Sequence, residues 1–367
     1  MPTPTYSWTL LRAGRFKLDG GGMFGVIPKV VWSRTVPCDD RNRIDVQHNC
    51  VLLTPVSPED SPQRRRERIE TTSAQTGSPG RSSADSASPL LHPPRLGGDS
   101  PVLGPILLEV GTGNKLDPKM REIFALEDRW IADALAEVST PCESIRHVIV
   151  SHLHFDHAGG LTRLLRPGEV GAPAPAPPYP GRGPGHPPHP VALTFPSAEV
   201  IVQRREWRDA LANNSVMTRT YFPDHLEPIE PRLRLIDTLP PYADGRAPGR
   251  EQDPVCPLED RMTEVLPGIF VFRVPGHTWG QQATLFRDKK GRTVVFTPDI
   301  MPTAAHVGQT YSLSYDVEPY VSMVCRRWFL REACQRDWLL VLDHEPGNPL
   351  VRVRENGKGW YQLVPEA

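Results

Sequence analysis

The chain has 367 residues, with 42 lysines and arginines against 43 aspartates and glutamates, so its formal net charge is −1. A balanced charge gives no general attraction to nucleic acid or to an anionic membrane, and no apolar run approaches the roughly 18 residues needed to span a bilayer. The 6 cysteines are scattered without a CxxC pair, which is typical of reduced thiols. We therefore expect a soluble, cytoplasmic protein without nucleic-acid or membrane partners.

The first distinctive segment, residues 20–25, reads GGGMFG. Its spacing lacks the pattern of a phosphate-binding loop, and its glycines permit a flexible hairpin. We expect this hairpin at the rim of a pocket, where Met23, Phe24 and Ile27 would offer apolar contacts to a substrate.

Three segments further along differ from the rest of the chain in composition. They cover residues 55–104, 166–190 and 242–260. The first has no aromatic residue, the second is rich in proline, and the third is polar, so they cannot bury enough apolar surface to offset the entropy of ordering. Because apolar strands at 49–54 and 105–110 flank the first segment, we interpret all three as low-complexity insertions in a single domain spanning 1–367.

The sequence SHLHFDHAGG at residues 151–160 follows a β-branched run that is typical of a buried strand. It contains four potential ligands, His152, His154, Asp156 and His157. Imidazole and carboxylate together are the usual ligands of a catalytic zinc ion. If the chain stays extended, alternate residues share one face; the following LTRLL, residues 161–165, could open a helix. Such a loop could serve two neighbouring metals, with further ligands from elsewhere.

The second half of the chain supplies those ligands at the ends of predicted strands. The strands cover residues 269–274, 283–287, 293–297 and 338–342, and an apolar spacing over 321–329 predicts an amphipathic helix. His277, Asp299 and His344 each follow one of these strands. Alternating strands and helices predict a layered α/β domain.

Taken in order, the HxHxDH run, PGHT, a strand-end aspartate and a late histidine resemble the metallo-β-lactamase superfamily. The segments DIMPTAAHV, YDVEPY and WLLVLDHEP are similar to the branch that contains quorum-quenching lactonases and methyl parathion hydrolase. The resemblance implies a four-layer αββα sandwich with metals along one edge of its two mixed sheets.

The resemblance also implies how two zinc ions, or other divalent metals, would be held. One would be bound by His152, His154 and His277, the other by Asp156, His157 and His344, with Asp299 bridging both. Two such metals share a water and supply hydroxide near neutral pH, which attacks a carbonyl. Asp156 is then the expected catalytic proton carrier.

Two positions depart from the family pattern. Glu109 stands where relatives carry an aspartate that orients a ligand histidine, so the orientation is either altered or kept through a shifted backbone. Pro302 stands where lactonases carry a tyrosine that holds the substrate carbonyl. His306, Tyr311 and Tyr315 are the candidates to replace it.

These features predict a dinuclear metal-dependent hydrolase, with a neutral lactone such as an N-acyl-homoserine lactone as its small-molecule substrate. Met301 and His306 join Met23, Phe24 and Ile27 as expected substrate contacts. Two alternatives stay open: a phosphotriester or other ester hydrolase on the same site, and a non-catalytic, metal-stabilised binding protein.

Overall fold

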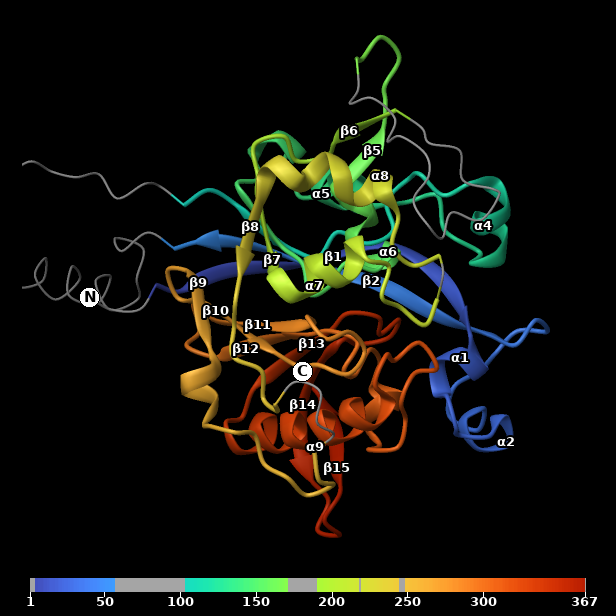
Figure 1. The fold of residues 1–367 in the computed structure, drawn as a ribbon, viewed down its shortest axis with the longest axis vertical. Helices are drawn as coiled ribbons and strands as arrows, with labels where there is room; N and C mark the ends of the chain where they lie inside the picture. The colour runs from blue at the N-terminus through green and yellow to red at the C-terminus, as the bar shows by residue number, and fades with distance from the viewer. Residues whose placement is uncertain (1–3, 57–102, 171–189, 218, 244–247, 367) are drawn as a thin grey trace, which may run out of the picture.

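The computed structural model describes residues 4–56, 103–170, 190–217, 219–243 and 248–366. In this part of the chain, two large β-sheets form the centre of the molecule (Figure 1). In spatial order, the first sheet contains β1 (Tyr6–Asp19), β2 (Arg43–Pro55), β3 (Ile106–Leu108), β4 (His147–Ile149), β7 (Glu199–Gln203) and β8 (Leu233–Ile236). The second contains β15 (Tyr361–Pro365), β14 (Leu350–Glu355), β13 (Leu339–Leu342), β12 (Thr293–Thr297), β11 (Gln282–Arg287), β10 (Ile269–Arg273) and β9 (Thr263–Leu266).

Helices cover the outer faces of both sheets. Those on the first sheet are α5 (Ile131–Glu137), α7 (Arg204–Leu211) and α8 (Pro223–Leu226), and α9 (Pro319–Gln335) lies on the second. The shorter elements are α1 (Gly20–Phe24), α2 (Lys29–Trp32), α4 (Pro118–Ile123), α6 (Phe155–Ala158), the small ribbon of β5 (Thr162–Leu164) and β6 (Val191–Leu193), and the 3₁₀ turns Cys142–Ser144, Gly159–Leu161, Glu227–Arg232, Leu258–Arg261 and Ala304–Val307. The predicted αββα sandwich is confirmed.

Side-chain alternation along the strands explains why both sheets are covered on both faces. On β3, Leu107 packs outward towards α5, while Ile106 and Leu108 pack between the sheets. On β10, Phe272 packs against α9, while Val271 faces the first sheet. Three apolar layers therefore separate four structural layers. No helix in the described ranges is both long and apolar enough to cross a membrane.

The predicted strands of both sheets and the helix over 321–329 are present, with boundaries shifted by a few residues. The helix expected at 161–165 is wrong: Thr162–Leu164 forms β5, because it pairs with β6. The chain also stops being extended after His154, where α6 begins.

The first two segments interpreted as insertions fall largely outside the described residues, at 57–102 and 171–189, whereas only 244–247 of the third do so. The described part of the third segment also packs against helix α9, which its polar composition did not predict. Tyr242 and Leu258 are buried in the apolar layer that also contains α9, and Glu251 and Asp253 pair with arginines of that helix.

Candidate metal centre

The predicted ligands meet at one edge of the sandwich because each follows the end of a strand. His152 and His154 follow β4 of the first sheet, and His277 follows β10 of the second. Asp299 and His344 follow β12 and β13, which run parallel to each other. The carboxyl ends of parallel strands lie at the same edge, so both sheets contribute side chains to one site.

The first group, which we term the three-histidine cluster, comprises His152, His154 and His277. One ring nitrogen from each lies within 4.8 Å of the others, and all three residues are buried. Burial, followed by repulsion from neighbouring imidazoles, lowers the pKa of His152 and of His154 well below the usual range. Both rings are therefore neutral at pH 7, with a lone pair available for a metal.

The second group, which we term the mixed cluster, comprises His157, Asp299, Asp343 and His344. Their candidate ligand atoms also lie within 4.8 Å of one another, and the Nε2 atoms of His157 and His344 are 3.1 Å apart. The predicted ligand Asp156 lies beside this group, with its Oδ2 3.6 Å from His344 Nε2. Asp343 was not among the predicted ligands.

Asp299, a member of the mixed cluster, also reaches the three-histidine cluster. Its Oδ2 is 3.1 Å from His277 Nε2 and 3.9 Å from His157 Nε2, and its Oδ1 is 3.4 Å from His344 Nε2. One carboxylate therefore reaches histidines of both clusters, which is the position that a bridging ligand requires.

The Nδ1 of His154 lies 2.9 Å from His277 Nε2 within its own cluster, and residues outside the clusters engage the Nδ1 of the other four histidines. The contacts are Ser151 Oγ to His152 (2.9 Å), Asp316 Oδ1 to His277 (2.9 Å), Glu109 Oε2 to His157 (3.2 Å) and the Gln47 carbonyl to His344 (3.1 Å). Contacts of this kind fix the ring orientation and the tautomer. In each case Nε2 is the nitrogen left to face the site.

Glu109, at the position where an aspartate was expected, contacts the site through both of its carboxylate oxygens. One carboxylate oxygen accepts a hydrogen bond from Ser151 N and the other faces His157 Nδ1. Its backbone has a φ of 65°, an unusual left-handed conformation for a residue other than glycine.

Glu206 is a buried acid that the sequence analysis did not single out. Its Oε1 accepts hydrogen bonds from Leu153 N (3.0 Å) and the Tyr221 hydroxyl (3.2 Å), and its Oε2 accepts one from Thr278 Oγ1 (2.6 Å). Leu153 stands between two histidines of the three-histidine cluster, and Thr278 follows the third. Glu206 itself comes just after β7, so the strand-end rule applied to the other ligands could have found it.

A cavity of about 540 Å³ opens onto the centre. Its polar residues include His154, Asp156, His277 and Asp299. Its apolar wall consists of Leu18, Met23, Met120, Ile123, Phe124, Phe155 and Met217, and Lys17, Arg41, Arg43 and Arg219 also line it. Lys17, Arg41 and Arg43 pair with nearby acids, so the wall facing a substrate is mainly apolar.

Of the five predicted substrate contacts, only Met23 lines this cavity. Residues 20–24 form helix α1 and not a hairpin, so Phe24 points inward, where its ring stacks on Trp32 and His306. Ile27 packs beside the same apolar group. Met301 is fully buried in the layer that contains α9.

The structure also separates the three candidates for the missing tyrosine. His306 is fully buried and bonded through Nδ1 to Thr303 and through Nε2 to the Met23 carbonyl. Tyr311 lines a different groove. Tyr315 lines the cavity, and a Cβ atom at Gly22 would collide with its hydroxyl. Gly22 therefore leaves the space that Tyr315 occupies.

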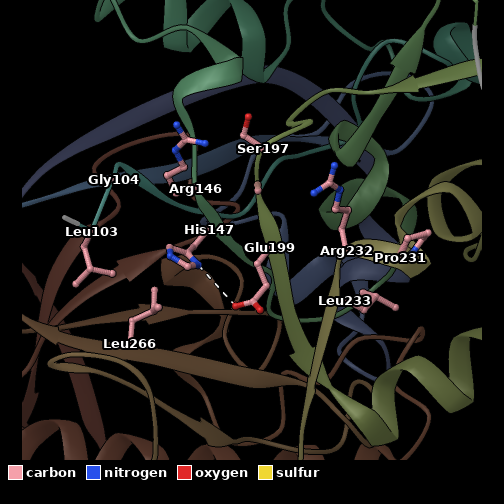
Figure 2. Close-up of a pocket in the computed structure, with 11 residues that line it drawn as sticks. Leu103, Gly104, Arg146, His147, Ser197, Glu199, Pro231, Arg232, Leu233 and Leu266 are labelled. Carbon is pink, nitrogen blue, oxygen red and sulfur yellow. Dashed lines mark ion pairs between the residues drawn. The ribbon is translucent and has the colours of Figure 1, made fainter. Parts of the chain in front are cut away.

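A second groove, of about 630 Å³, lies at the opposite ends of strands β4, β7 and β8 (Figure 2). Its centre holds the His147–Glu199 pair, with Nδ1 and Oε2 3.7 Å apart, and Arg146 and Arg232 lie above this pair in the view. Neither of the ligand groups found in the described residues includes any of its side chains. Although it is larger, this groove is not the metal centre.

Comparison with known proteins agrees with this architecture. Residues 105–180 match the model of the metallo-beta-lactamase superfamily. An N-acyl homoserine lactonase from a Bacillus species is 28% identical over 182 residues, which are 50% of this chain and 47% of that protein. The chain thus spans about half the length of the curated relative that it matches.

Solved structures match the whole fold at lower identity. A probable metal-dependent hydrolase from Staphylococcus aureus has a TM-score of 0.64 at 22% identity, with 100% of both chains covered. AidC, a dizinc quorum-quenching lactonase in complex with the product N-hexanoyl-L-homoserine, has a TM-score of 0.60 at 15% identity, covering 100% of this chain and 96% of that one. The segment that matches the superfamily model contains the HxHxDH run, and the chain as a whole has the same fold as these solved structures.

Proposed function

We propose that the protein is a dinuclear metal-dependent hydrolase that opens lactones, with N-acyl-homoserine lactones as the best-fitting class. The observation that carries the proposal is the position of Asp299, which joins two buried ligand clusters at the floor of an apolar cavity. Lactonases among the similar proteins support the choice of substrate.

The residues of the centre fit a pair of divalent metals. Nε2 of His152 and Oδ1 of Asp299 are buried without a hydrogen-bond partner among the described residues, and Nδ1 of His154 faces His277 Nε2 within the three-histidine cluster. Leaving buried polar atoms unpaired is costly unless something else binds them. Neutral imidazoles and carboxylates are the donor set that zinc prefers at catalytic sites.

Bound metals would lower the pKa of a water molecule to near neutrality and polarise the substrate carbonyl. The protein supplies the rest of the chemistry. Asp156 lines the cavity beside the mixed cluster, where its carboxylate can take a proton from the attacking water and return it to the leaving alkoxide. The Tyr315 hydroxyl, on the same cavity wall, can donate a hydrogen bond to the substrate carbonyl.

The wall of the cavity favours a neutral substrate with an apolar tail. Met120, Phe155 and Met217 offer flexible or flat apolar surface, and methionine side chains adapt to tails of different shape. Each methylene group buried there contributes up to about 0.8 kcal/mol. Catalytic efficiency should therefore rise with acyl length until the cavity is full.

A hydrolysis panel tests the proposal. Zinc-loaded protein would be given short- and long-chain acyl-homoserine lactones, simple γ-lactones and aryl phosphotriesters, with acid release measured for the lactones. We expect the long-chain lactones to be hydrolysed fastest, and Asp156→Asn to slow the reaction. Turnover of phosphotriesters with no lactone opening would exclude the lactonase, and two bound metals without any turnover would indicate a binding protein.

A further inference from the structure

We propose that Asp343 is an additional carboxylate ligand of the second metal, and that this site accepts a harder cation such as Mn²⁺ more readily than the three-histidine cluster does. The inference rests on the proposed two-metal hydrolase. It concerns a residue outside the seven ligands that the family resemblance implies.

The position of Asp343 is fixed from both sides. It follows β13 directly, its N–H donates to the Thr297 carbonyl at the end of β12 (3.3 Å), and its own carbonyl accepts from Asn49 N (2.8 Å). These contacts hold its side chain in the mixed cluster, where its carboxylate lies within 4.8 Å of the ligand atoms of His157, Asp299 and His344.

The Asp343 side chain is buried without a matching partner. The residue is 2% exposed, and neither carboxylate oxygen has a hydrogen-bond partner among the described residues. Asp299 lies in the same cluster with its own Oδ1 unpartnered. Two buried carboxylates repel each other strongly in a medium of low dielectric constant, so this pair needs either a cation or a shared proton.

The donor atoms of the two clusters differ in a way that matters for metal choice. The three-histidine cluster offers nitrogen from three imidazoles, whereas the mixed cluster offers two imidazoles and two carboxylates. Imidazole suits zinc, and carboxylate oxygen suits manganese and magnesium. With Asp343 as a ligand, the second site is therefore the more anionic and the richer in oxygen.

The variant Asp343→Asn distinguishes whether a bound cation or a shared proton balances the charge of the Asp299 and Asp343 carboxylates. Asparagine has nearly the same shape and can donate a hydrogen bond to Asp299, as a protonated aspartate would, but it supplies no negative charge. We expect the variant to keep one equivalent of Zn²⁺ and to bind the second at least about 100-fold more weakly, since losing even a residue behind a ligand costs about 10- to 100-fold. Calorimetry and metal analysis of the full chain measure this.

Manganese tests the second half of the proposal. Mn²⁺ added to wild-type protein that holds one equivalent of Zn²⁺ should bind and give an altered electron paramagnetic resonance spectrum, and Asp343→Asn should abolish this binding. If the Asn variant does not fold, Asp343→Glu carries the test: the charge is kept but displaced, so Mn²⁺ should bind more weakly with a changed spectrum. Equal Mn²⁺ binding by wild type and folded variant would overturn the proposal.

Glu345→Gln is the matched control. Glu345 is two residues away, is partly exposed, and accepts a hydrogen bond from Ala304 N outside the cluster (2.9 Å). This variant should keep both equivalents with wild-type affinity. If wild type itself binds fewer than two metals, the proposed dinuclear function fails; if wild type and Asp343→Asn bind two with the same affinity, only the role of Asp343 fails.

Discussion

The three-histidine cluster and the mixed cluster meet at Asp299, but the protein supports them differently. Around the first, Glu206 of α7 binds the loops that carry His154 and His277. Around the second, support comes from the sheets themselves: the Gln47 carbonyl of β2 and Glu109, which follows β3. The cavity reaches His154 and His277 but not the histidines of the mixed cluster. One cluster is thus more accessible and depends on a helix side chain, while the other is deeper and held by the strands.

The largest effect should come from Asp299→Ala, because this carboxylate contacts histidines of both clusters. We expect both metals to be lost. Removing a contribution of several kcal/mol corresponds to a fall of at least about a thousandfold in kcat/KM. Metal analysis and kinetics check this. Loss of a single metal equivalent with full activity would show that the two clusters do not share Asp299.

Glu206→Gln and Glu109→Gln should weaken different metals. In the first variant an amide NH₂ would face the donors that Glu206 now accepts, so we expect the metal of the three-histidine cluster to bind about 10- to 100-fold more weakly. In Glu109→Gln the metal of the mixed cluster should be the one affected. Calorimetric titration with zinc separates the two sites, and equal losses at both sites in both variants would contradict the comparison.

A smaller effect is expected at the cavity wall. Phe155 lines the cavity and its ring stacks on Phe124, so Phe155→Ala should remove contact with about two methylene groups. This loss corresponds to about a tenfold fall in kcat/KM for long-chain lactones, with little change for short ones.

Phe24→Ala is the matched control for the cavity wall. The Phe24 ring is fully buried away from the cavity, so its removal should cost about 3–5 kcal/mol of stability without any chain-length effect. A chain-length effect in this variant would instead place Phe24 on the substrate path.

The smallest effect is expected at Lys115, whose Nζ donates to the Gly159 and Thr162 carbonyls next to the mixed cluster. Burial lowers the pKa of Lys115 from 10.5 to about 7. Between these pH values the unfolded chain binds a proton that the folded chain does not. This group therefore makes stability rise with pH across that window, by up to about 1.4 kcal/mol per pH unit.

Denaturant unfolding between pH 7 and 10.5 tests this dependence. The profile of Lys115→Met should be flatter than that of wild type, and the profile of the exposed Lys119→Met should follow wild type. Parallel profiles for all three proteins would show that Lys115 is protonated throughout.

Sequence reasoning located the centre because strand ends are visible as apolar runs. His277, Asp299 and His344 could be found from the runs that precede them, and all three lie in the two clusters. The same reasoning missed Asp343 because histidine is the commonest metal ligand, and His344 directly follows it. It missed Glu206, which also follows a strand, because that carboxylate binds a backbone N–H and two hydroxyl groups and is not itself a ligand.

The pocket was harder to predict than the metal ligands. The glycines of residues 20–22 suggested a flexible hairpin, but Asp19 caps a short helix there by accepting from Gly22 N. A helix turns each successive side chain by about 100°, whereas a strand alternates them. Met23 therefore lines the cavity while Phe24 is buried, and the far wall, from Met120 to Met217, comes from segments without a recognisable motif.

Both clusters draw ligands from both sheets, since β4 leads into the HxHxDH run while β10, β12 and β13 lead to the other ligands. Any ion that binds only this native arrangement stabilises it by mass action. The stability of this edge of the molecule would then depend on the concentration of free zinc in the cell. A chain starved of metal should open first along this edge, while the opposite ends of the strands stay closed by apolar packing. Proteolytic cleavage at this edge would then report the loss of metal.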